Sequence, residues 1–214
     1  MIGHVPDGRI VLEWRPLRIY QHRLPALRPR EVREYYDRLS KSYSMLYGPE
    51  QAMKHGKLLE RMGKRKYDVF VDIGCGDGVL LSKVRHRSSL RVGLDFSPGM
   101  LEKARYVLEG GASLVRGDAR HLPFRDRVAD CVVSISLSER GNIEVLASEV
   151  ARIARSDANV LISMITPDGS LPTEFPGLRL LDRSLLSTRE TLFVLSKTGR
   201  PMLKNEWSRM DEGR

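Results

Sequence analysis

Residues 69–78 read Val-Phe-Val-Asp-Ile-Gly-Cys-Gly-Asp-Gly, an apolar run that ends in an aspartate and three alternating glycines. The β-branched and aromatic residues at its start suit a strand that is buried on both faces. Gly74, Gly76 and Gly78 allow a tight turn and a close approach of a ligand to the backbone. Helix-like apolar spacing resumes at Val79. We therefore expect a strand, a glycine-rich turn and a helix that build a nucleotide-type pocket at the carboxyl end of the strand.

Carboxylates also follow the next two expected strands. The second strand ends at Asp95, 17 positions after Gly78, where a side chain can accept hydrogen bonds from both hydroxyls of a ribose. The third strand, residues 112–117, leads into Asp118, whose carboxylate can accept the amino group of adenine. These positions favour a ligand that contains a nucleoside.

The order of the expected elements indicates an α/β fold. From Tyr67 to Thr166, strand-like runs alternate with helical patterns, which is typical of βαβ units and a parallel sheet. Ser97 is a helix N-cap that is followed by proline at the first helical position. The later helices are expected at 97–109 and 142–154, and the later strands at 128–136, 159–165, 178–186 and 191–197.

Four motifs, in this order and at these spacings, resemble the class I S-adenosylmethionine-dependent methyltransferases. The likeness is greatest to the group that includes ubiquinone-biosynthesis and wobble-uridine tRNA methyltransferases. The motifs are Asp72–Gly78, Gly93–Arg105, Gly117–Asp126, and Asp130–Ser134 with the helix at 146–154. The resemblance covers about residues 68–166. It implies a Rossmann-like, doubly wound, mostly parallel seven-stranded sheet whose last strand is antiparallel.

The resemblance also implies S-adenosylmethionine as cofactor and a set of residues that bind it. Asp72 would meet the ammonium group of the cofactor, Asp95 its ribose, and Ser134 its carboxylate. No catalytic residue and no metal ligand is assigned. The expected cofactor-binding residues are Tyr36, Tyr43, Asp72, Gly74, Cys75, Gly76, Asp77, Gly78, Asp95, Phe96, Ser97, Met100, Asp118, Ala119 and Ser134.

Several of these residues have an ordinary structural alternative. Phe96 and Met100 would pack on the purine, or they belong to the core. Tyr36 and Tyr43 lie where related enzymes place an aromatic lid, yet both follow the apolar stripe of a helix, so core packing is an alternative for at least one. His121 is either a base or an ordinary surface or packed residue.

The chain departs from the family pattern after the fourth strand. Ser134-Ile-Ser-Leu-Ser-Glu-Arg140 stands where amino methyltransferases often carry Asn/Asp-Pro-Pro-Tyr/Phe. The turn Arg-Pro-Gly-Gly before the fifth strand is replaced by Arg155-Ser-Asp-Ala158. The segment after the fifth strand is short, which suits a large substrate or a partner subunit that closes the site. The acceptor of the methyl group is not readable from these residues.

Composition bounds the class of protein. The 214 residues suffice for one methyltransferase domain at 31–214, with N-terminal helices at 31–66, a cofactor-binding core at 67–166 and C-terminal strands at 167–214. The two cysteines are not expected to pair, and neither a membrane span nor a signal peptide is expected, so we expect a cytoplasmic protein. Charged residues reach 29%, and asparagine and glutamine are scarce, which suggests a thermophile.

Positive charge is concentrated before the core. Residues 1–66 hold 15 Lys and Arg against 7 Asp and Glu, whereas residues 67–214 hold 21 against 20. Residues 1–30 form a Pro- and Arg-rich arm, in which residues 10–14 could form a short strand. Residues 31–62 are expected to be helical with a break at Gly48-Pro49. A localised basic surface indicates a polyanion partner, and its ordinary alternative is a solvated face.

These observations leave three hypotheses for the function. The first is a methyltransferase that acts on RNA, either tRNA or rRNA, through the basic N-terminal third. The second is a small-molecule methyltransferase with a quinone-like acceptor. The third is a non-catalytic cofactor-binding subunit that serves another methyltransferase, although an intact glycine turn and Asp95 argue against it.

Overall fold

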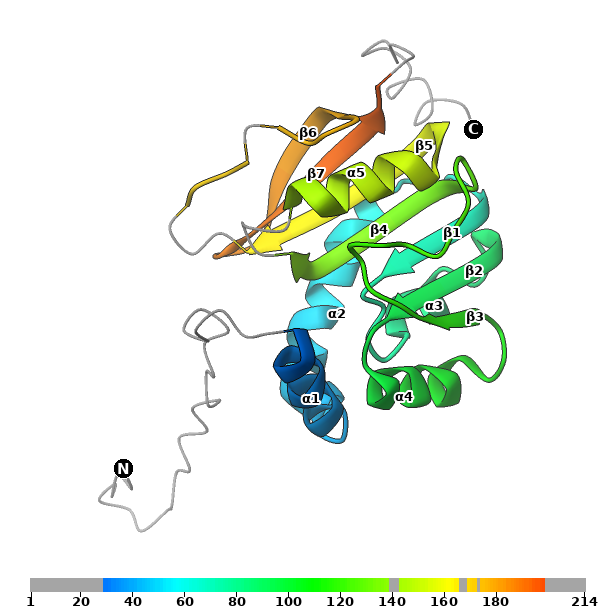
Figure 1. Cartoon of the computed structure of the whole chain (residues 1–214), viewed down its shortest axis with the longest axis vertical. Helices are drawn as coiled ribbons and strands as arrows, with labels where there is room; N and C mark the ends of the chain where they lie inside the picture. The colour runs from blue at the N-terminus through cyan, green and yellow to red at the C-terminus, as the bar shows by residue number, and fades with distance from the viewer. Residues whose placement is uncertain (1–28, 139–142, 166–168, 173, 199–214) are drawn as a thin grey trace.

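A seven-stranded sheet forms the centre of the molecule in the computed structural model, which describes residues 29–138, 143–165, 169–172 and 174–198 (Figure 1). The strand order is β3-β2-β1-β4-β5-β7-β6. Neighbours from β3 to β5 are parallel, and β7 is antiparallel to both β5 and β6, so the expected fold class is confirmed. The strands are β1 (Tyr67–Ile73), β2 (Ser88–Asp95), β3 (Ser113–Arg116), β4 (Ala129–Ser138), β5 (Ala154–Ile165), β6 (Leu178–Ser187) and β7 (Glu190–Lys197).

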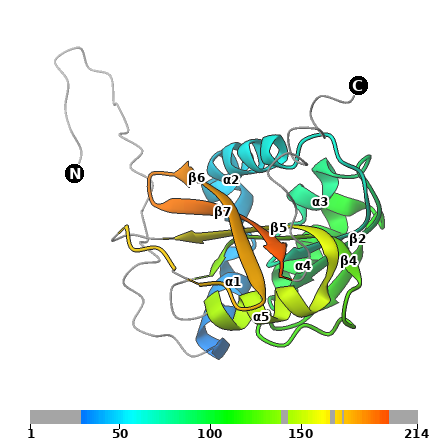
Figure 2. The same cartoon turned by 90° about the horizontal axis from the view of Figure 1, so that it is seen from above.

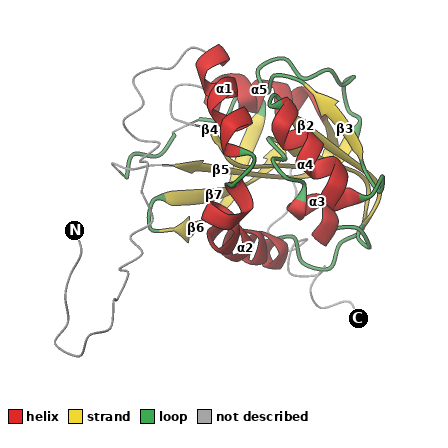
Figure 3. Cartoon of the chain, turned by 90° about the horizontal axis from the view of Figure 1, so that it is seen from below, coloured by secondary structure: helices red, strands yellow, loops and turns green. Residues whose placement is uncertain are grey.

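Helices cover both faces of the sheet (Figure 2, Figure 3). One face packs against α2, α3 and α4, whose buried side chains share a cluster with Phe70, Val133 and Leu161 of the strands. The other face packs against α5. The helices are α1 (Pro29–Leu39), α2 (Tyr43–Arg61), α3 (Val79–Lys83), α4 (Pro98–Leu108) and α5 (Ile143–Ile153).

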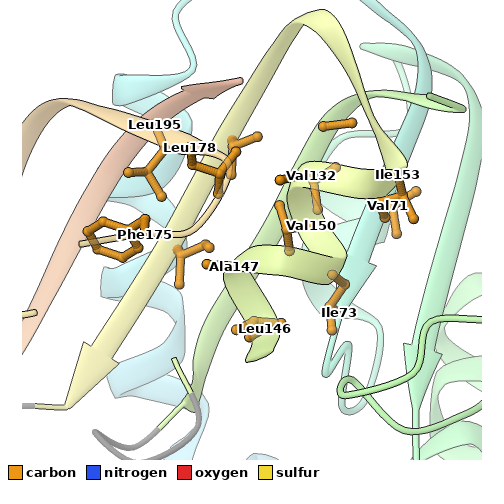
Figure 4. Close-up of a cluster of buried hydrophobic side chains, with 14 of the residues drawn as sticks. Val71, Ile73, Val132, Leu146, Ala147, Val150, Ile153, Phe175, Leu178 and Leu195 are labelled. Atoms are coloured by element: carbon orange, nitrogen blue, oxygen red, sulfur yellow. The ribbon is translucent and has the colours of Figure 1, made fainter. Parts of the chain in front are cut away.

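The larger core cluster lies between α5 and the sheet. Leu146, Ala147 and Val150 are spaced at three and four positions, so they present one apolar stripe of α5 to the strands. This stripe meets Val71 and Val132 at the centre of the sheet (Figure 4). The central strands β1 and β4 are therefore largely buried on both faces, as their continuous apolar runs predict, whereas the edge strand β3 is more exposed.

The expected helix break at Gly48-Pro49 is wrong. The helix α2 runs through Pro49 without interruption, and the chain turns earlier, between Leu39 and Tyr43. Pro49 is exposed, so water can satisfy the carbonyl group that loses its N–H partner. The turn is stabilised locally, because the Ser40 backbone N–H donates to the Tyr36 carbonyl over 2.8 Å.

The fifth strand begins five residues earlier than expected. The Arg155–Ala158 segment is not a turn but extends β5, and Ala154 pairs with Ala129 of β4. The chain therefore passes from α5 directly into the strand.

The expected short strand at residues 10–14 lies outside the described residues. Among the described helices, none combines the length and the apolar character that a membrane crossing requires.

Candidate active site

The glycine turn (residues 74–78) lies at the carboxyl end of β1. All three of its glycines have positive φ, at 76°, 53° and 76°. The N–H groups of Gly74 and Cys75 donate to the Leu94 carbonyl over 2.7 and 3.0 Å, which fastens the turn to β2. A Cβ at Gly76 would meet no atom within 4 Å, whereas one at Gly78 would lie 3.0 Å from the Ala104 Cβ. Gly76 thus borders open space, and Gly78 allows the turn to pack on α4.

Asp95 lies at the end of β2, beside the glycine turn. One oxygen of its carboxylate accepts the Gly76 N–H over 2.9 Å, and the other accepts the Ser97 N–H over 2.9 Å. The side chain is buried, and burial raises its pKa in spite of these hydrogen bonds. Each carboxylate oxygen can accept more than one hydrogen bond, so Asp95 retains capacity for a ligand.

Asp72, the last acidic residue of β1, has a carboxyl group whose pKa is strongly raised. It is only 3% exposed. Burial raises its pKa to about 8, and the nearby negative charges of Asp95 and Asp77 add to the shift. Three carboxylates thus gather around one turn. Such a cluster favours a ligand that brings positive charge.

The helix α2 covers the glycine turn. Tyr43, Gln51 and His55 lie on one face of this helix and line a cleft together with Asp72, Cys75, Asp77, Leu80, Ile135 and the glycines at 74 and 76. The empty volume of the cleft is about 370 Å³, part of which is open to solvent. The Gln51 amide donates to the Tyr43 hydroxyl over 3.3 Å. Burial raises the pKa of Tyr43, so its phenol stays protonated.

Hydrogen bonds hold α2 against the glycine turn and α1 against the start of α4; we call these two helices the lid helices. The Ser44 hydroxyl donates to Asp77 of the glycine turn over 2.9 Å. Asp37 of α1 accepts the Ser97 hydroxyl over 2.6 Å and the Gly99 N–H over 3.2 Å. The Tyr36 ring meets Phe96 edge to face, with centroids 6.1 Å apart. The lid helices therefore contact both the turn and the residues that follow Asp95.

Comparison with known proteins identifies the domain. Residues 70–157 match the family model of a methyltransferase domain. Over 140 residues the chain is 29% identical to demethylmenaquinone methyltransferase of Corynebacterium kroppenstedtii. That alignment covers 63% of this chain and 60% of the relative, so the chain spans less than two thirds of the relative's length.

Residues 70–157 therefore lie in a methyltransferase domain, in agreement with the expected class I S-adenosylmethionine-dependent methyltransferases. Solved structures share its fold. One chain of the complex between the Haloferax volcanii Trm112 methyltransferase activator and a methyltransferase superposes with a TM-score of 0.68 at 18% identity, covering 80% of this chain and 100% of that chain. Phosphoethanolamine N-methyltransferase 1 of Haemonchus contortus, solved with phosphoethanolamine and S-adenosylhomocysteine, gives 0.65 at 16% identity and covers 86% and 53%.

The site of this methyltransferase domain fits its family's cofactor. S-adenosylmethionine carries an ammonium and a sulfonium, and the three carboxylates around the glycine turn supply the opposite charge. The open space at Gly76 lets a ligand approach the backbone. Among the described residues, no group of three or more His, Cys, Asp or Glu side chains is arranged to hold a metal ion.

Asp118 and Met100, two of the expected cofactor contacts, also have structural roles, in an ion pair and in the core respectively. Asp118 follows β3 at the same edge as Asp95, but both of its oxygens accept from the Arg120 guanidinium, at 2.6 to 3.1 Å. This interaction lowers the pKa of Asp118. Met100 is 1% exposed, as a core residue would be. Phe96 and Ala119 are half-buried, and His121 is exposed.

Ser134 does not line the cleft. Its neighbours Val133 and Val132 belong to the clusters on opposite faces of the sheet, so the alternation of β4 turns Ser134 toward the α5 side with Val132. The Ser134 hydroxyl is fully buried and has no hydrogen-bond partner among the described residues. Ile135, the next residue, points to the cleft instead.

Sequence reasoning missed Asp37, Gln51 and His55. Gln51 and His55 were missed because a helix break at Pro49 would have separated them from Tyr43. The continuous helix α2 instead places positions 43, 51 and 55 on one side. His55 is 8% exposed, and its Nδ1 has no partner among the described residues. Burial and the charges of Lys83 and Lys54 lower its pKa to about 4, so the imidazole is neutral at pH 7.

Proposed function

We propose that this protein transfers the methyl group of S-adenosylmethionine to RNA, either tRNA or rRNA. The observation that carries the proposal is the distribution of charge. The surplus of positive charge lies in residues 1–66, and α2 of that segment lines the cleft. A polyanion drawn to this segment would be delivered to the mouth of the cofactor site.

The residues around the cleft have separate tasks in this proposal. Bound S-adenosylmethionine supplies an activated methyl group on a sulfonium. Asp72 and Asp77 would hold the ammonium group, and Asp95 would accept from the ribose hydroxyls. Tyr43 and Ile135 would exclude water above the glycine turn. Methyl transfer by direct displacement needs positioning and a dry site more than a protein nucleophile.

Labelled methyl transfer tests the acceptor. The purified protein is incubated with tritiated S-adenosylmethionine and with separated tRNA, rRNA, protein and small-molecule fractions. We expect label in an RNA fraction and an RNA affinity that falls steeply with salt, because phosphate contacts release counterions. Label confined to another fraction, or binding that does not change with salt, contradicts the RNA proposal.

A quinone-like small molecule is the second candidate acceptor. The likeness to demethylmenaquinone methyltransferase of Corynebacterium kroppenstedtii favours it. In the same experiment this candidate predicts label in the organic extract of the small-molecule fraction. It also predicts that removal of the basic arm leaves methyl transfer unchanged.

We also infer that a protein partner contacts the domain. The superposition with a chain of the Trm112 complex supports this inference. Met45 and Met53 of α2 are 72% and 47% exposed, which leaves apolar surface on a lid helix. Size-exclusion chromatography of the protein with its copurifying partners tests it. A monomer that is fully active without any added protein would contradict it.

A further inference from the structure

A buried ion pair lies directly behind one wall of the cleft. Lys54 of α2 and Glu190 at the start of β7 are 2.6 Å apart, and their side chains are 5% and 2% exposed. Glu50, one helical turn before Lys54, lies 2.9 Å from the same ammonium. A buried ion pair is costly unless further hydrogen bonds satisfy it. The hydroxyls of two serines provide them.

Ser136 and Ser163 complete this polar cluster. The Ser136 hydroxyl donates to Glu190 over 2.8 Å and accepts from Lys54 over 3.1 Å. The Ser163 hydroxyl also donates to Glu190, and it accepts the Ser136 backbone N–H over 2.8 Å. The cluster thus fixes both the side chain and the backbone of Ser136.

The backbone at Ser136 is strained. Its φ is +57°, in the left-handed region that residues other than glycine seldom adopt. The pairing of β4 with β5 is irregular here, with a register shift between Ser134 and Ser138. Strained residues and irregular strand ends persist where the surrounding structure enforces them, and they often redirect a side chain beside an active site.

The cluster adjoins the cleft on two sides. Ile135, which precedes Ser136, lines the cleft, and so does His55, which follows Lys54. Ser136 itself is half-buried, whereas Ser163 is fully buried. Ser136 is therefore the one serine of this pair that a molecule in the cleft could reach.

We propose that Ser136 is a positioning residue for the methyl acceptor, held in place by the Lys54–Glu190 pair. The inference rests on the proposed methyl transfer. A hydroxyl has one proton and two lone pairs. The proton goes to Glu190 and one lone pair to Lys54, so one lone pair remains for a donor. The acceptor that fits is a nitrogen or oxygen group that carries a hydrogen.

Two substitutions separate positioning from a purely structural role. Ser136→Ala removes the hydroxyl and keeps the backbone conformation under strain, whereas Ser136→Gly removes both the hydroxyl and the strain. Ser196→Ala is the matched control, because Ser196 is a buried serine near the other end of β7 whose hydroxyl has no partner among the described residues.

For each variant we measure the melting temperature, the Kd of S-adenosylmethionine by calorimetry, and kcat/KM for the labelled acceptor fraction. Both Ser136 variants should bind the cofactor within about twofold of the wild type. Their kcat/KM should fall on the order of 10- to 100-fold, the range expected when a reacting group is misplaced. Ser196→Ala should match the wild type in Kd and kcat/KM, and its melting temperature should be equal or higher because the variant lacks a buried hydroxyl without a partner.

Each other outcome overturns at least one of the two proposals. Unchanged kcat/KM in both Ser136 variants, or a parallel loss of cofactor affinity, overturns the positioning role. If the wild type labels only a small-molecule or protein fraction, the RNA proposal fails, and the same comparison of kcat/KM with that acceptor still decides the role of Ser136. If cofactor binds but no fraction is labelled, either by the protein alone or together with its copurifying partners, both proposals are wrong.

Discussion

The Ser97 hydroxyl donates to the Asp37 carboxylate over 2.6 Å, and this bond joins α4 to α1 through two residues that are 60 positions apart in the chain. The same carboxylate oxygen accepts the Gly99 N–H, and the Ser97 oxygen accepts the Met100 N–H over 3.1 Å. Asp37 therefore reinforces the N-cap of α4 while it fixes α1. Ser97, two residues after Asp95, and the lid helix α1 thus form one hydrogen-bonded unit.

Replacement of Asp37 should loosen this unit. Asp37→Ala leaves Ser97 and Gly99 without their acceptor, so we expect the free energy of unfolding to fall by about 1–3 kcal/mol. Asp37→Asn keeps a carbonyl oxygen as acceptor and should cost less. Urea denaturation measures both. If the alanine variant were as stable as the wild type, the contact between α1 and α4 would contribute nothing.

Pro49 offers a test of the continuous lid helix. A proline inside a helix lacks the N–H donor, so Pro49→Ala should raise the free energy of unfolding by about 1–3 kcal/mol if α2 is unbroken. Pro98→Ala is the matched control, since Pro98 occupies the first turn of α4, where proline is favourable. Thermal melts compare the two. A loss of stability in Pro49→Ala would restore the helix break that the sequence suggested.

The parallel part of the fold was predictable because its signals are local. Continuous apolar runs, the glycine turn and the Ser97 cap each predict the element in which they lie. The continuity of the lid helix α2 and the start of β5 could not be predicted from local signals. At Pro49, exposure to water offsets the local signal of a proline that breaks a helix. At Arg155–Ala158, a polar stretch joins the strand because the residues on both sides of it, Ala154 and Asn159, pair with β4.

The candidate site also contains features that were predictable from local sequence and features that were not. Its carboxylates at strand ends could be located from the strand pattern alone, since parallel strands place their carboxyl ends at one edge. The contact of Asp37 with Ser97 and the ion pair of Lys54 with Glu190 join segments 60 and 136 positions apart. No local pattern encodes such pairs. At Ser134 the strand pattern located the right strand but the wrong residue. Neighbouring side chains of β4 point to opposite faces of the sheet, so Ile135 lines the cleft and Ser134 does not.

Asp95→Ala should weaken cofactor binding. If Asp95 accepts from the ribose hydroxyls, the loss should be about 1.5–3 kcal/mol of binding free energy, as expected for hydrogen bonds to a charged group. Asp68→Ala is the control, since Asp68 is an exposed carboxylate at the amino end of β1. Calorimetry with S-adenosylmethionine measures both variants. An unchanged Kd in Asp95→Ala would remove this residue from the site.

Asp72 should make stability depend on pH. Its pKa rises from 3.8 to about 8 on folding, so between these values the folded protein binds one proton more than the unfolded chain. The free energy of unfolding should therefore fall as pH rises from about 4 to about 8. Asp72→Asn removes this slope and should be more stable than the wild type at pH 7, by on the order of 1–4 kcal/mol.

The same substitution should weaken cofactor binding. The ammonium group of the cofactor favours the ionised carboxylate, so the wild type should release a proton on binding below pH 8. Calorimetry at pH 7 in two buffers of different ionisation enthalpy detects that proton. Asp72→Asn should bind more weakly and release none. Equal proton release by the variant and the wild type would assign the proton to another group.

Deletion of residues 1–28 should spare cofactor binding, because every cofactor motif and both lid helices lie after this segment. The segment contains five arginines, and each phosphate contact contributes about 0.7–0.9 to the slope of log affinity against log salt. The salt dependence of RNA binding should therefore become flatter. A full-length variant with these five arginines changed to glutamine should reproduce the flatter slope without the deletion. If the deletion lowers the melting temperature and leaves the slope unchanged, the arm is structural and RNA binds elsewhere.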